Sequence, residues 1–329
     1  VGRYLPIEPT SLNHPWICLS YFRMTFFART PLLSLLLVVF CSPGENSQVG
    51  QDAERDYEKA DEEFLRPSLV DLNCECGRPG AVGRIFGGFP VTPSNKYPFM
   101  AVIRKDGRSI QGGTLLNDRF VLTTARGLYR SEFSSLEVIL GMSSRDSETS
   151  GAVKYEVKRY KLHGSFKFEN PTSPFDIAVI RVIGTVTFTP NIQPICLPSQ
   201  ADTQYAESNY GVVLGWGSTN ASPDYSDKLT EIPVKAISTY DCQATGIGRY
   251  SVQETICAGK VSGGSVLKEG DFGGPLVFNT GRNHVQMGIA SFKSQDSLPD
   301  VYIYVRMFVK WIHKKTTRGI YCSNPIAKY

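Results

Sequence analysis

Short apolar runs bounded by turn-forming residues recur along the second half of the chain. The clearest are residues 136–140, 176–182 and 211–214, which are rich in aliphatic and β-branched residues and are flanked by Gly, Pro and Ser. Runs of this length and composition predict β-strands. A helix is predicted over residues 305–317, and Gly319, just beyond this range, is the signal that ends it. The pattern therefore predicts an all-β domain with a helix close to its C-terminal end.

The composition is that of an ordinary globular protein. The 329 residues are 41% hydrophobic and 20% charged, and length alone allows one large or two modest domains. The formal net charge of +4 is modest and indicates no particular class of partner. We expect neither a nucleic-acid partner nor a cofactor.

The N-terminal part differs in character from the rest of the chain. Residues 24–44 begin at the first methionine and contain an arginine, a short apolar run and small residues, which predicts a secretory leader too short to span a bilayer. We interpret residues 1–23 as translated upstream sequence. Residues 45–84 form an acidic pro-segment and linker, predicted to be solvated and largely disordered over 45–73. We therefore expect a secreted, extracellular protein without a transmembrane segment.

Several motifs together carry a resemblance to a known family. The Gly-Asp-Phe-Gly-Gly-Pro-Leu stretch at 270–276 resembles the segment around the nucleophile of chymotrypsin- and trypsin-like serine proteases. Segments 121–127 and 175–179 are similar to those that carry the family's catalytic histidine and aspartate. Further similar segments follow in the family order at 84–88, 111–115, 193–198, 215–217, 255–259, 288–291 and 299–302. The resemblance covers residues 85–329 and implies two packed antiparallel six-stranded β-barrels followed by a C-terminal α-helix.

The positions matched to the catalytic residues hold unusual side chains. The resemblance places Phe272 at the nucleophile, Arg126 at the histidine and Asp176 at the aspartate. A phenyl ring has no atom that can attack a carbonyl, and a guanidinium, which stays protonated throughout the physiological pH range, cannot act as a general base. The triad aspartate orients an imidazole; since none is present, we expect Asp176 to form an ion pair with Arg126.

These substitutions predict a catalytically inactive homologue, similar to those of arthropods. We expect it to act as a binding or regulatory module whose partners are active serine proteases, their substrates or their inhibitors. Two alternatives remain open: an active trypsin-like endopeptidase with an unorthodox site, and a surface-binding defence protein that recognises anionic polysaccharide.

The resemblance also implies a proteolytic switch. The Arg84–Ile85 bond is similar to the family's activation site, where cleavage frees an ammonium group that pairs with the residue matched here by Asp271. Gly270 matches a donor of the oxyanion hole. We expect the switch either to be used or to be inherited without use.

The substrate pocket is altered as well. The family reads its primary specificity at the position of Val266, where trypsin-like members carry an aspartate. Glycines that leave the family's pocket open are replaced by Lys293 and Asp300. We expect Phe272 to plug the entrance.

Cysteines indicate a disulfide framework. Two of the eight, Cys18 and Cys41, lie in or before the leader. An even number in a secreted chain implies bridges, and the remaining six are Cys74, Cys76, Cys196, Cys242, Cys257 and Cys322. A metal site is disfavoured because the close pair at 74 and 76 has no second close pair and no nearby histidine.

The resemblance implies particular pairings. Cys242 and Cys257 match a family pair. Cys196 is expected to join one cysteine of the 74/76 pair, and the other is expected to join Cys322, with the choice left open. Gln111 and Gly127 replace one family bridge; Lys268 and Asp296 replace another, and these two could form an ion pair. We expect the affected loops to be looser.

Two surface features complete the prediction. Lys310, Lys314 and Arg318 are spaced four residues apart at the predicted helix, which would place three cations along one face. The ordinary interpretation is a solvated face, and the functional one is a glycosaminoglycan or microbial-envelope site. Asn220 begins an Asn-Ala-Ser glycosylation sequon.

Overall fold

The structure is a computed structural model, and the chain divides into two units, residues 1–65 and 66–329. Within the first unit, β1 (Trp16–Leu19) pairs antiparallel with β2 (Phe40–Pro43). The residues that the structure describes are 16–19, 40–43, 69–78, 89–90, 95–142, 144, 151–202, 209–219, 222–247, 253–281, 283–295 and 297–324. Most of the predicted leader and most of the acidic pro-segment lie outside these ranges, and both assignments remain predictions.

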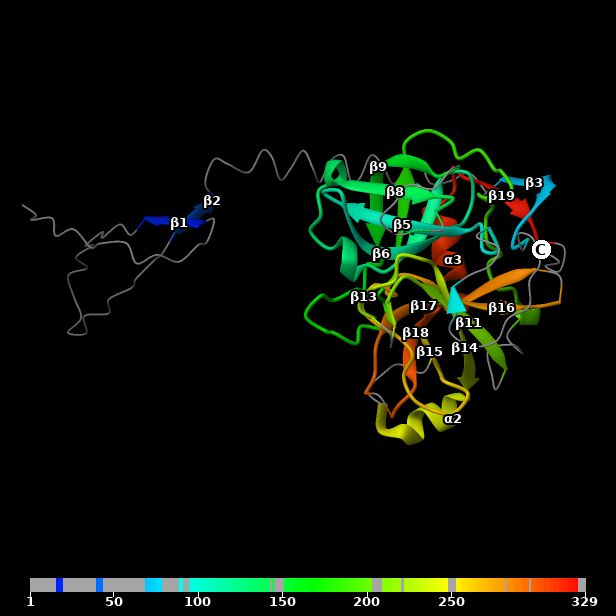
Figure 1. The fold of residues 1–329 in the computed structure, drawn as a ribbon. Coiled ribbons are helices and arrows are strands. Elements are labelled where there is room, and N and C mark those ends of the chain that lie inside the picture. Colours follow the sequence, from blue (N-terminus) through cyan, green and yellow to red (C-terminus); the bar gives the residue numbers. More distant parts are fainter. Residues whose placement is uncertain are drawn as a thin grey trace, which may run out of the picture. The chain divides into compact units, whose positions relative to one another are not determined.

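The first half of the second unit is a closed six-stranded antiparallel barrel with the order β10-β7-β6-β5-β8-β9. Figure 1 labels β5, β6, β8 and β9 of this barrel. Its strands are β5 (Met100–Lys105), β6 (Arg108–Leu115), β7 (Phe120–Thr123), β8 (Leu136–Leu140), β9 (Val153–Leu162) and β10 (Ala178–Val182). Alternate side chains of a strand point to opposite faces, so Ala178, Ile180 and Val182 of β10 enter the barrel interior. Predicted strand 136–140 is confirmed, and predicted strand 176–182 begins two residues later.

The second half forms a second barrel, which closes through the pairing of β11 with β14; β4 (Phe89–Pro90) adds to β14. Its six strands are β11 (Tyr210–Gly215), β14 (Thr230–Ile237), β15 (Thr255–Gly259), β16 (Pro275–Asn279), β17 (His284–Phe292) and β18 (Asp300–Tyr304). A ribbon of β12 (Ser218–Thr219) and β13 (Ser222–Tyr225) follows β11. The all-β prediction and the prediction of two six-stranded barrels are confirmed.

Short helices occupy a few of the connections. They are η2 (Arg126–Leu128), η3 (Phe133–Ser135), α2 (Thr239–Cys242) and η5 (Gln243–Ile247). Among the described residues, no helix is long and apolar enough to cross a membrane.

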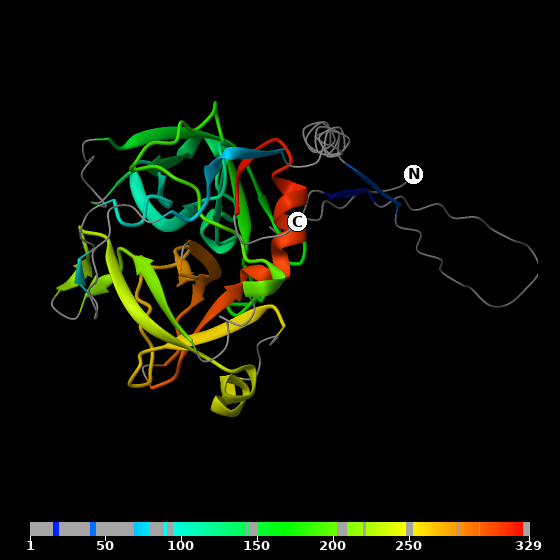
Figure 2. The same ribbon diagram turned by 90° about the vertical axis from the view of Figure 1, so that its right-hand side faces the viewer.

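The predicted terminal helix is α3 (Val305–Lys315), which runs beside both barrels (Figure 2). Val305, Phe308 and Ile312 recur at helical spacing and join a buried cluster to which both barrels contribute. The helix ends two residues before the predicted boundary. Arg318 therefore lies beyond α3, and the expected row of three helical cations is wrong, because only Lys310 and Lys314 are on the helix.

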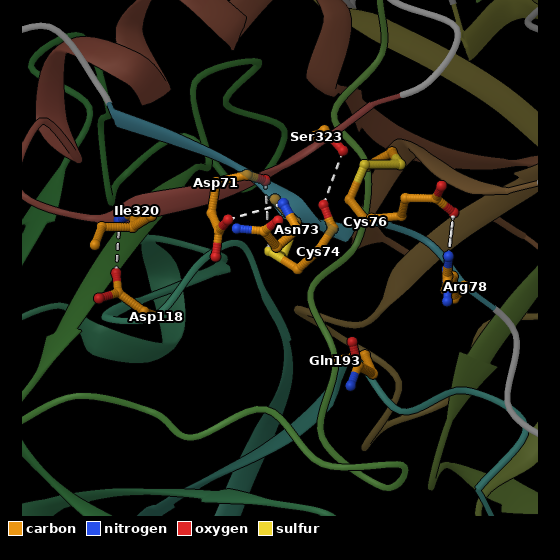
Figure 3. The surroundings of a disulfide bond; sticks show 12 residues. Asp71, Asn73, Cys74, Cys76, Arg78, Asp118, Gln193, Ile320 and Ser323 are labelled. Atoms are coloured by element: carbon orange, nitrogen blue, oxygen red, sulfur yellow. Dashed lines mark hydrogen bonds and ion pairs between the residues drawn. A yellow bond between two sulfur atoms is a disulfide. The ribbon is translucent and has the colours of Figure 1, made fainter.

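A further strand ties the segment before the barrels to the C-terminal end. β3 (Leu69–Glu75) pairs in parallel with β19 (Ile320–Ser323), and Asp118 accepts a hydrogen bond from the Ile320 amide at 2.7 Å (Figure 3). Residues 69–73 are thus strand rather than disordered, which corrects the prediction for that end of the pro-segment. The sequence signal was missed because the strand has its pairing partner about 250 residues away.

Three disulfides answer the pairing question that the sequence left open. Cys74 bonds to Cys322, Cys76 bonds to Cys196, and the implied pair of Cys242 with Cys257 is confirmed. The segment that precedes the barrels is therefore held to the rest of the second unit by two covalent bonds.

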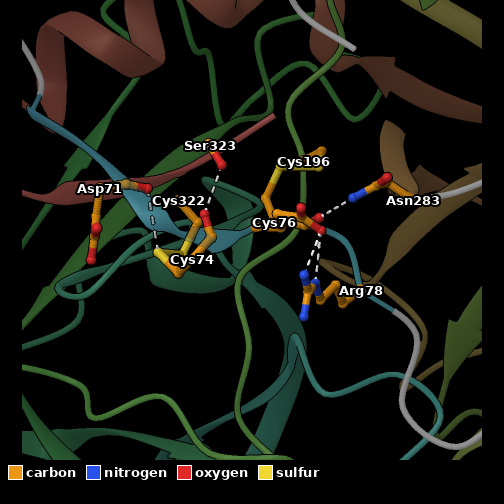
Figure 4. A network of polar contacts seen from close by, with 9 residues as sticks. Asp71, Cys74, Cys76, Arg78, Cys196, Asn283, Cys322 and Ser323 are labelled. Atoms are coloured by element: carbon orange, nitrogen blue, oxygen red, sulfur yellow. Dashed lines mark hydrogen bonds and ion pairs between the residues drawn. A yellow bond between two sulfur atoms is a disulfide. The ribbon is translucent and has the colours of Figure 1, made fainter. Parts of the chain in front are cut away.

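The same segment is also held by its backbone. Asn283 donates its side-chain amide to the Cys76 carbonyl at 2.6 Å (Figure 4), and the His284 amide donates to the Gly77 carbonyl at 2.7 Å. Gly77 has φ +66°, and a Cβ there would lie 2.2 Å from the His284 carbonyl oxygen. Only glycine fits such a close approach.

Candidate active site

Asp176 lies two residues before β10, and its side-chain oxygens accept hydrogen bonds from Arg126 and Ser291. It is only 2% exposed. Its Oδ1 accepts from the Arg126 backbone N–H at 2.7 Å, and its Oδ2 accepts from the Ser291 hydroxyl at 2.8 Å. Burial raises the pKa of this carboxyl, and its hydrogen bonds and the charge of Arg126 oppose that rise. Ser291 was not singled out from the sequence, although it lies within the recognised 288–291 segment.

The Arg126 side chain points to a different partner. Its Nη1 donates to the Phe168 carbonyl at 3.0 Å and its Nη2 to the Asn170 carbonyl at 2.7 Å. The guanidinium carbon also lies 5.8 Å from the centre of the Phe166 ring and 5.2 Å from that of Phe168, within the range of cation–π attraction.

The expected ion pair between Arg126 and Asp176 is therefore wrong. The backbone N–H of Arg126 already occupies one oxygen of Asp176, and Ser291 occupies the other. The guanidinium instead satisfies two carbonyls of the neighbouring loop, next to aromatic rings. An arginine side chain is long enough to reach past the position where an imidazole would end.

Phe272 lies in a tight turn between the two barrels. Its ring is half-buried and packs against the apolar cluster of the second barrel, and its carbonyl accepts from the Gly112 amide of β6 at 2.9 Å. Gly273 follows at φ +78°, where an added Cβ would lie 2.3 Å from the Gly112 carbonyl oxygen and 2.5 Å from Thr123 Oγ1. The turn is thus pressed against the strand that leads to Arg126.

Hydrogen bonds bring the three matched positions together. The Gly273 amide donates to the Ala290 carbonyl at 2.9 Å, and the next residue of β17, Ser291, donates to Asp176. Thr123 donates to the Gly112 carbonyl at 2.7 Å, three residues before Arg126. Residues predicted to share a site from three separated motifs therefore do lie at one junction between the barrels.

Asp271 is a second buried carboxylate, 2% exposed. It accepts from the Gly217 amide at 2.7 Å and from the Lys268 amide at 2.9 Å. Cβ atoms added at Gly215 or Gly217 would lie 2.1 and 2.4 Å from its oxygens, which explains the Gly-Trp-Gly sequence there. Burial, reinforced by the charge of Asp300, raises the pKa of Asp271 to about 6.

No described side chain forms an ion pair with Asp271. The predicted partner, an ammonium at Ile85, and the Arg84–Ile85 bond itself lie outside the described residues. Gly270 has φ +97°, a conformation that favours glycine.

Asp300 is a third carboxylate and is completely buried. Its Oδ1 accepts from the Ser265 hydroxyl at 2.7 Å and the Ser294 amide at 3.0 Å. Its Oδ2 accepts from the amides of Val266 at 2.6 Å and Leu267 at 2.8 Å. The carboxylate therefore organises the backbone at the predicted specificity position, a role that the sequence did not indicate.

Gln111 and Gly127, which were expected to replace a family bridge, fit closely against each other. Gln111 is buried and accepts from the Thr124 hydroxyl at 2.6 Å. A Cβ added at Gly127 would lie within 2.4 Å of the Gln111 carboxamide carbon. The carboxamide thus occupies the space beside Gly127 and braces the segment that carries Arg126.

Other predicted features have no described counterpart. Asn220 and Asp296 lie outside the described residues, so the glycosylation and the Lys268–Asp296 ion pair stay predictions. Within the part of the chain that the structure describes, no three His, Cys, Asp or Glu side chains are placed to hold a metal ion.

Comparisons with known proteins place this architecture in a family. The family model described as Trypsin matches residues 85–312. The chain is 32% identical to Trypsin 5G1 of Aedes aegypti over 70% of its length and 84% of that protein.

Two longer proteins are similar as well. The chain is 31% identical to human Transmembrane protease serine 5 over 74% of its length, and 30% identical to rat Coagulation factor XII over 81%. The matches span only 54% and 46% of those two proteins, about half of each. With the two closed barrels and the terminal helix, these matches show that the chain belongs to the trypsin family of serine proteases.

Proposed function

We propose that this protein is a secreted, non-catalytic member of the trypsin family that binds other proteins and regulates proteolysis. The observation that carries the proposal is Phe272, which lies in the glycine-bounded turn that matches the family's nucleophile. Its ring packs against the second barrel and offers no group for covalent chemistry.

The surroundings of Asp176 support the same proposal. A general base must lie within hydrogen-bonding reach of the group that it deprotonates. The side chain at the matched position is Arg126, which is permanently charged and donates to two loop carbonyls. Asp176 accordingly has no imidazole to orient.

Labelling with a fluorophosphonate tests the proposal directly. We expect no labelling and no hydrolysis of peptide amides, either before or after cleavage at Arg84–Ile85, because loss of the nucleophile or base costs on the order of 10⁶ in kcat. An active trypsin, carried through the same steps, is the positive control. Stoichiometric labelling of a single residue would show that the protein is an enzyme.

We further propose that cleavage at Arg84–Ile85 acts as a conformational switch. Asp271 is buried without an ion-pair partner among the described residues, and a new ammonium group there would compensate its charge. Because Cys74 and Cys76 are bonded to other parts of the chain, the cleaved segment stays attached.

The switch has its own test. Non-reducing electrophoresis of the cleaved protein should give one band, and reduction should release a short fragment. The melting temperature should rise after cleavage, and Asp271→Asn should abolish that rise. Unchanged melting after verified cleavage would mean that the switch is not used.

A further inference from the structure

Three arginines gather on the outer face of the first barrel, away from the catalytic positions. The strand register places Arg181 of β10 opposite Arg159 of β9. Directly opposite residues of antiparallel strands extend from the same face. Because Ile180 and Val182 fill the barrel interior, Arg181 and Arg159 point outward. Arg119 adjoins them, since its carbonyl accepts from the Val182 amide at 3.0 Å.

Arg181 is unusual because most of the residue is buried while its charged end makes no ion pair with any residue that the structure describes. The residue is only 7% exposed. Within the described part of the chain, neither it nor Arg159 makes a side-chain hydrogen bond or an ion pair. The Arg181 guanidinium nitrogens are not fully occluded from solvent, so the charged end of the side chain reaches the surface.

The positive charges of Arg159 and Arg119 disfavour the protonated form of Arg181, and a bound anion would offset this repulsion. Burial lowers the pKa of Arg181, and the charges of Arg159 and Arg119 lower it further. Asp118 opposes the effect, but its Oδ1 already accepts from the Ile320 amide at 2.7 Å and its Oδ2 lies 3.4 Å from Arg119 Nε. Arg181 thus has two neighbouring guanidinium groups, of Arg159 and Arg119, and one carboxylate that is already engaged elsewhere.

We propose that Arg119, Arg159 and Arg181 form a binding site for a tetrahedral oxyanion, a sulfate or phosphate group. Guanidinium groups present planar sets of donors that match such oxygens, and hydrogen bonds between charged partners are the strong ones. The anion is either a free ion or a sulfate ester of a polysaccharide. This inference goes beyond the proposed function and holds whether or not the domain cleaves peptides.

Binding to the full-length protein tests the site, with sodium sulfate, sodium phosphate and a heparin-derived hexasaccharide as probes. Each is titrated against sodium chloride of equal ionic strength, by calorimetry and by thermal unfolding. We expect saturable binding that Arg159→Gln and Arg181→Gln each weaken about tenfold or more, as expected for loss of a hydrogen bond between charged groups. Lys235→Gln removes one exposed cation from the second barrel and should leave binding unchanged.

The probes also identify the source of the anion. Binding of the hexasaccharide at least about tenfold tighter than sulfate would indicate a sulfated polysaccharide, and equal binding would indicate a free ion. The double variant Lys310→Gln, Lys314→Gln removes the cations of α3 and should not abolish binding. Equal binding by wild type and the Arg159→Gln variant, or no saturable binding, would overturn the proposal. Arg159→Gln keeps the test valid if the buried Arg181 cannot be replaced.

Discussion

Replacing Asp271 by Asn should make the uncleaved protein progressively more stable than wild type as the pH rises. The pKa of Asp271 is raised from 3.8 to about 6 in the folded chain. Between these values the folded chain holds a proton that the unfolded chain has released. Stability from this group is therefore fully present below pH ~4 and is lost as the pH rises through about 6. Asn resembles the protonated form at every pH.

The magnitude follows from the size of the shift. A difference of about two pKa units corresponds to about 3 kcal/mol at 1.36 kcal/mol per unit. We therefore expect the difference in unfolding free energy between Asp271→Asn and wild type to change by about 2 kcal/mol between pH 4 and pH 7, because part of the full effect falls below pH 4. Any fixed cost of the amide cancels, because only the change with pH is used.

Urea unfolding at a series of pH values measures this difference. The disulfides stay intact, and Arg84→Gln in both proteins prevents cleavage that would supply an ammonium group to Asp271. Asp106→Asn makes the same substitution at an exposed turn and controls for general effects. A difference between Asp271→Asn and wild type that is constant from pH 4 to pH 7 would refute the argument that an uncompensated carboxylate is buried there.

The remaining predictions concern the core and the candidate site. Burial lowers the His284 pKa to about 4, so wild type loses stability as the pH falls from 6.5 to about 4, and His284→Phe should abolish this loss; unfolding free energies at pH 4 and pH 7 should differ less in the variant than in wild type. Gly127→Ala should destabilise by about 1–3 kcal/mol through overpacking against Gln111, and Gln111→Ala should relieve that clash; additive effects in the double-mutant cycle would contradict the fitted pair. Phe272→Ser with Arg126→His should not give robust turnover of a Lys or Arg amide substrate, because the predicted specificity position holds Val266 and its backbone is bonded to the buried Asp300 carboxylate; such turnover would contradict the argument that the substrate pocket is altered.

The three positions matched to the catalytic residues show what short sequence segments can and cannot predict. Motifs around Arg126, Asp176 and Phe272 could be aligned from short segments, because each segment is contiguous and its order is preserved. The direction of the Arg126 side chain could not be predicted from the sequence, since its carbonyl partners at Phe168 and Asn170 lie in a loop more than 40 residues away.

The altered pocket gives a second example. The sequence identified Val266 and Asp300 as unusual residues at pocket positions, because position alone marks them. It did not reveal that Asp300 accepts from the amide of Val266, because a buried carboxylate and a solvent-exposed one look alike in a sequence. Burial is a property of the packed chain.

Sequence by itself determined the all-β class, the helix near residue 305 and the cysteine count, because strand pattern, helix signals and composition are local. Only the tertiary structure decided that Cys74 joins Cys322 and that β3 is a strand. The same holds for the arginines at 159 and 181, whose encounter depends on the register of two strands about 20 residues apart. Pairing, register and burial arise from contacts between distant segments, and no local pattern encodes them.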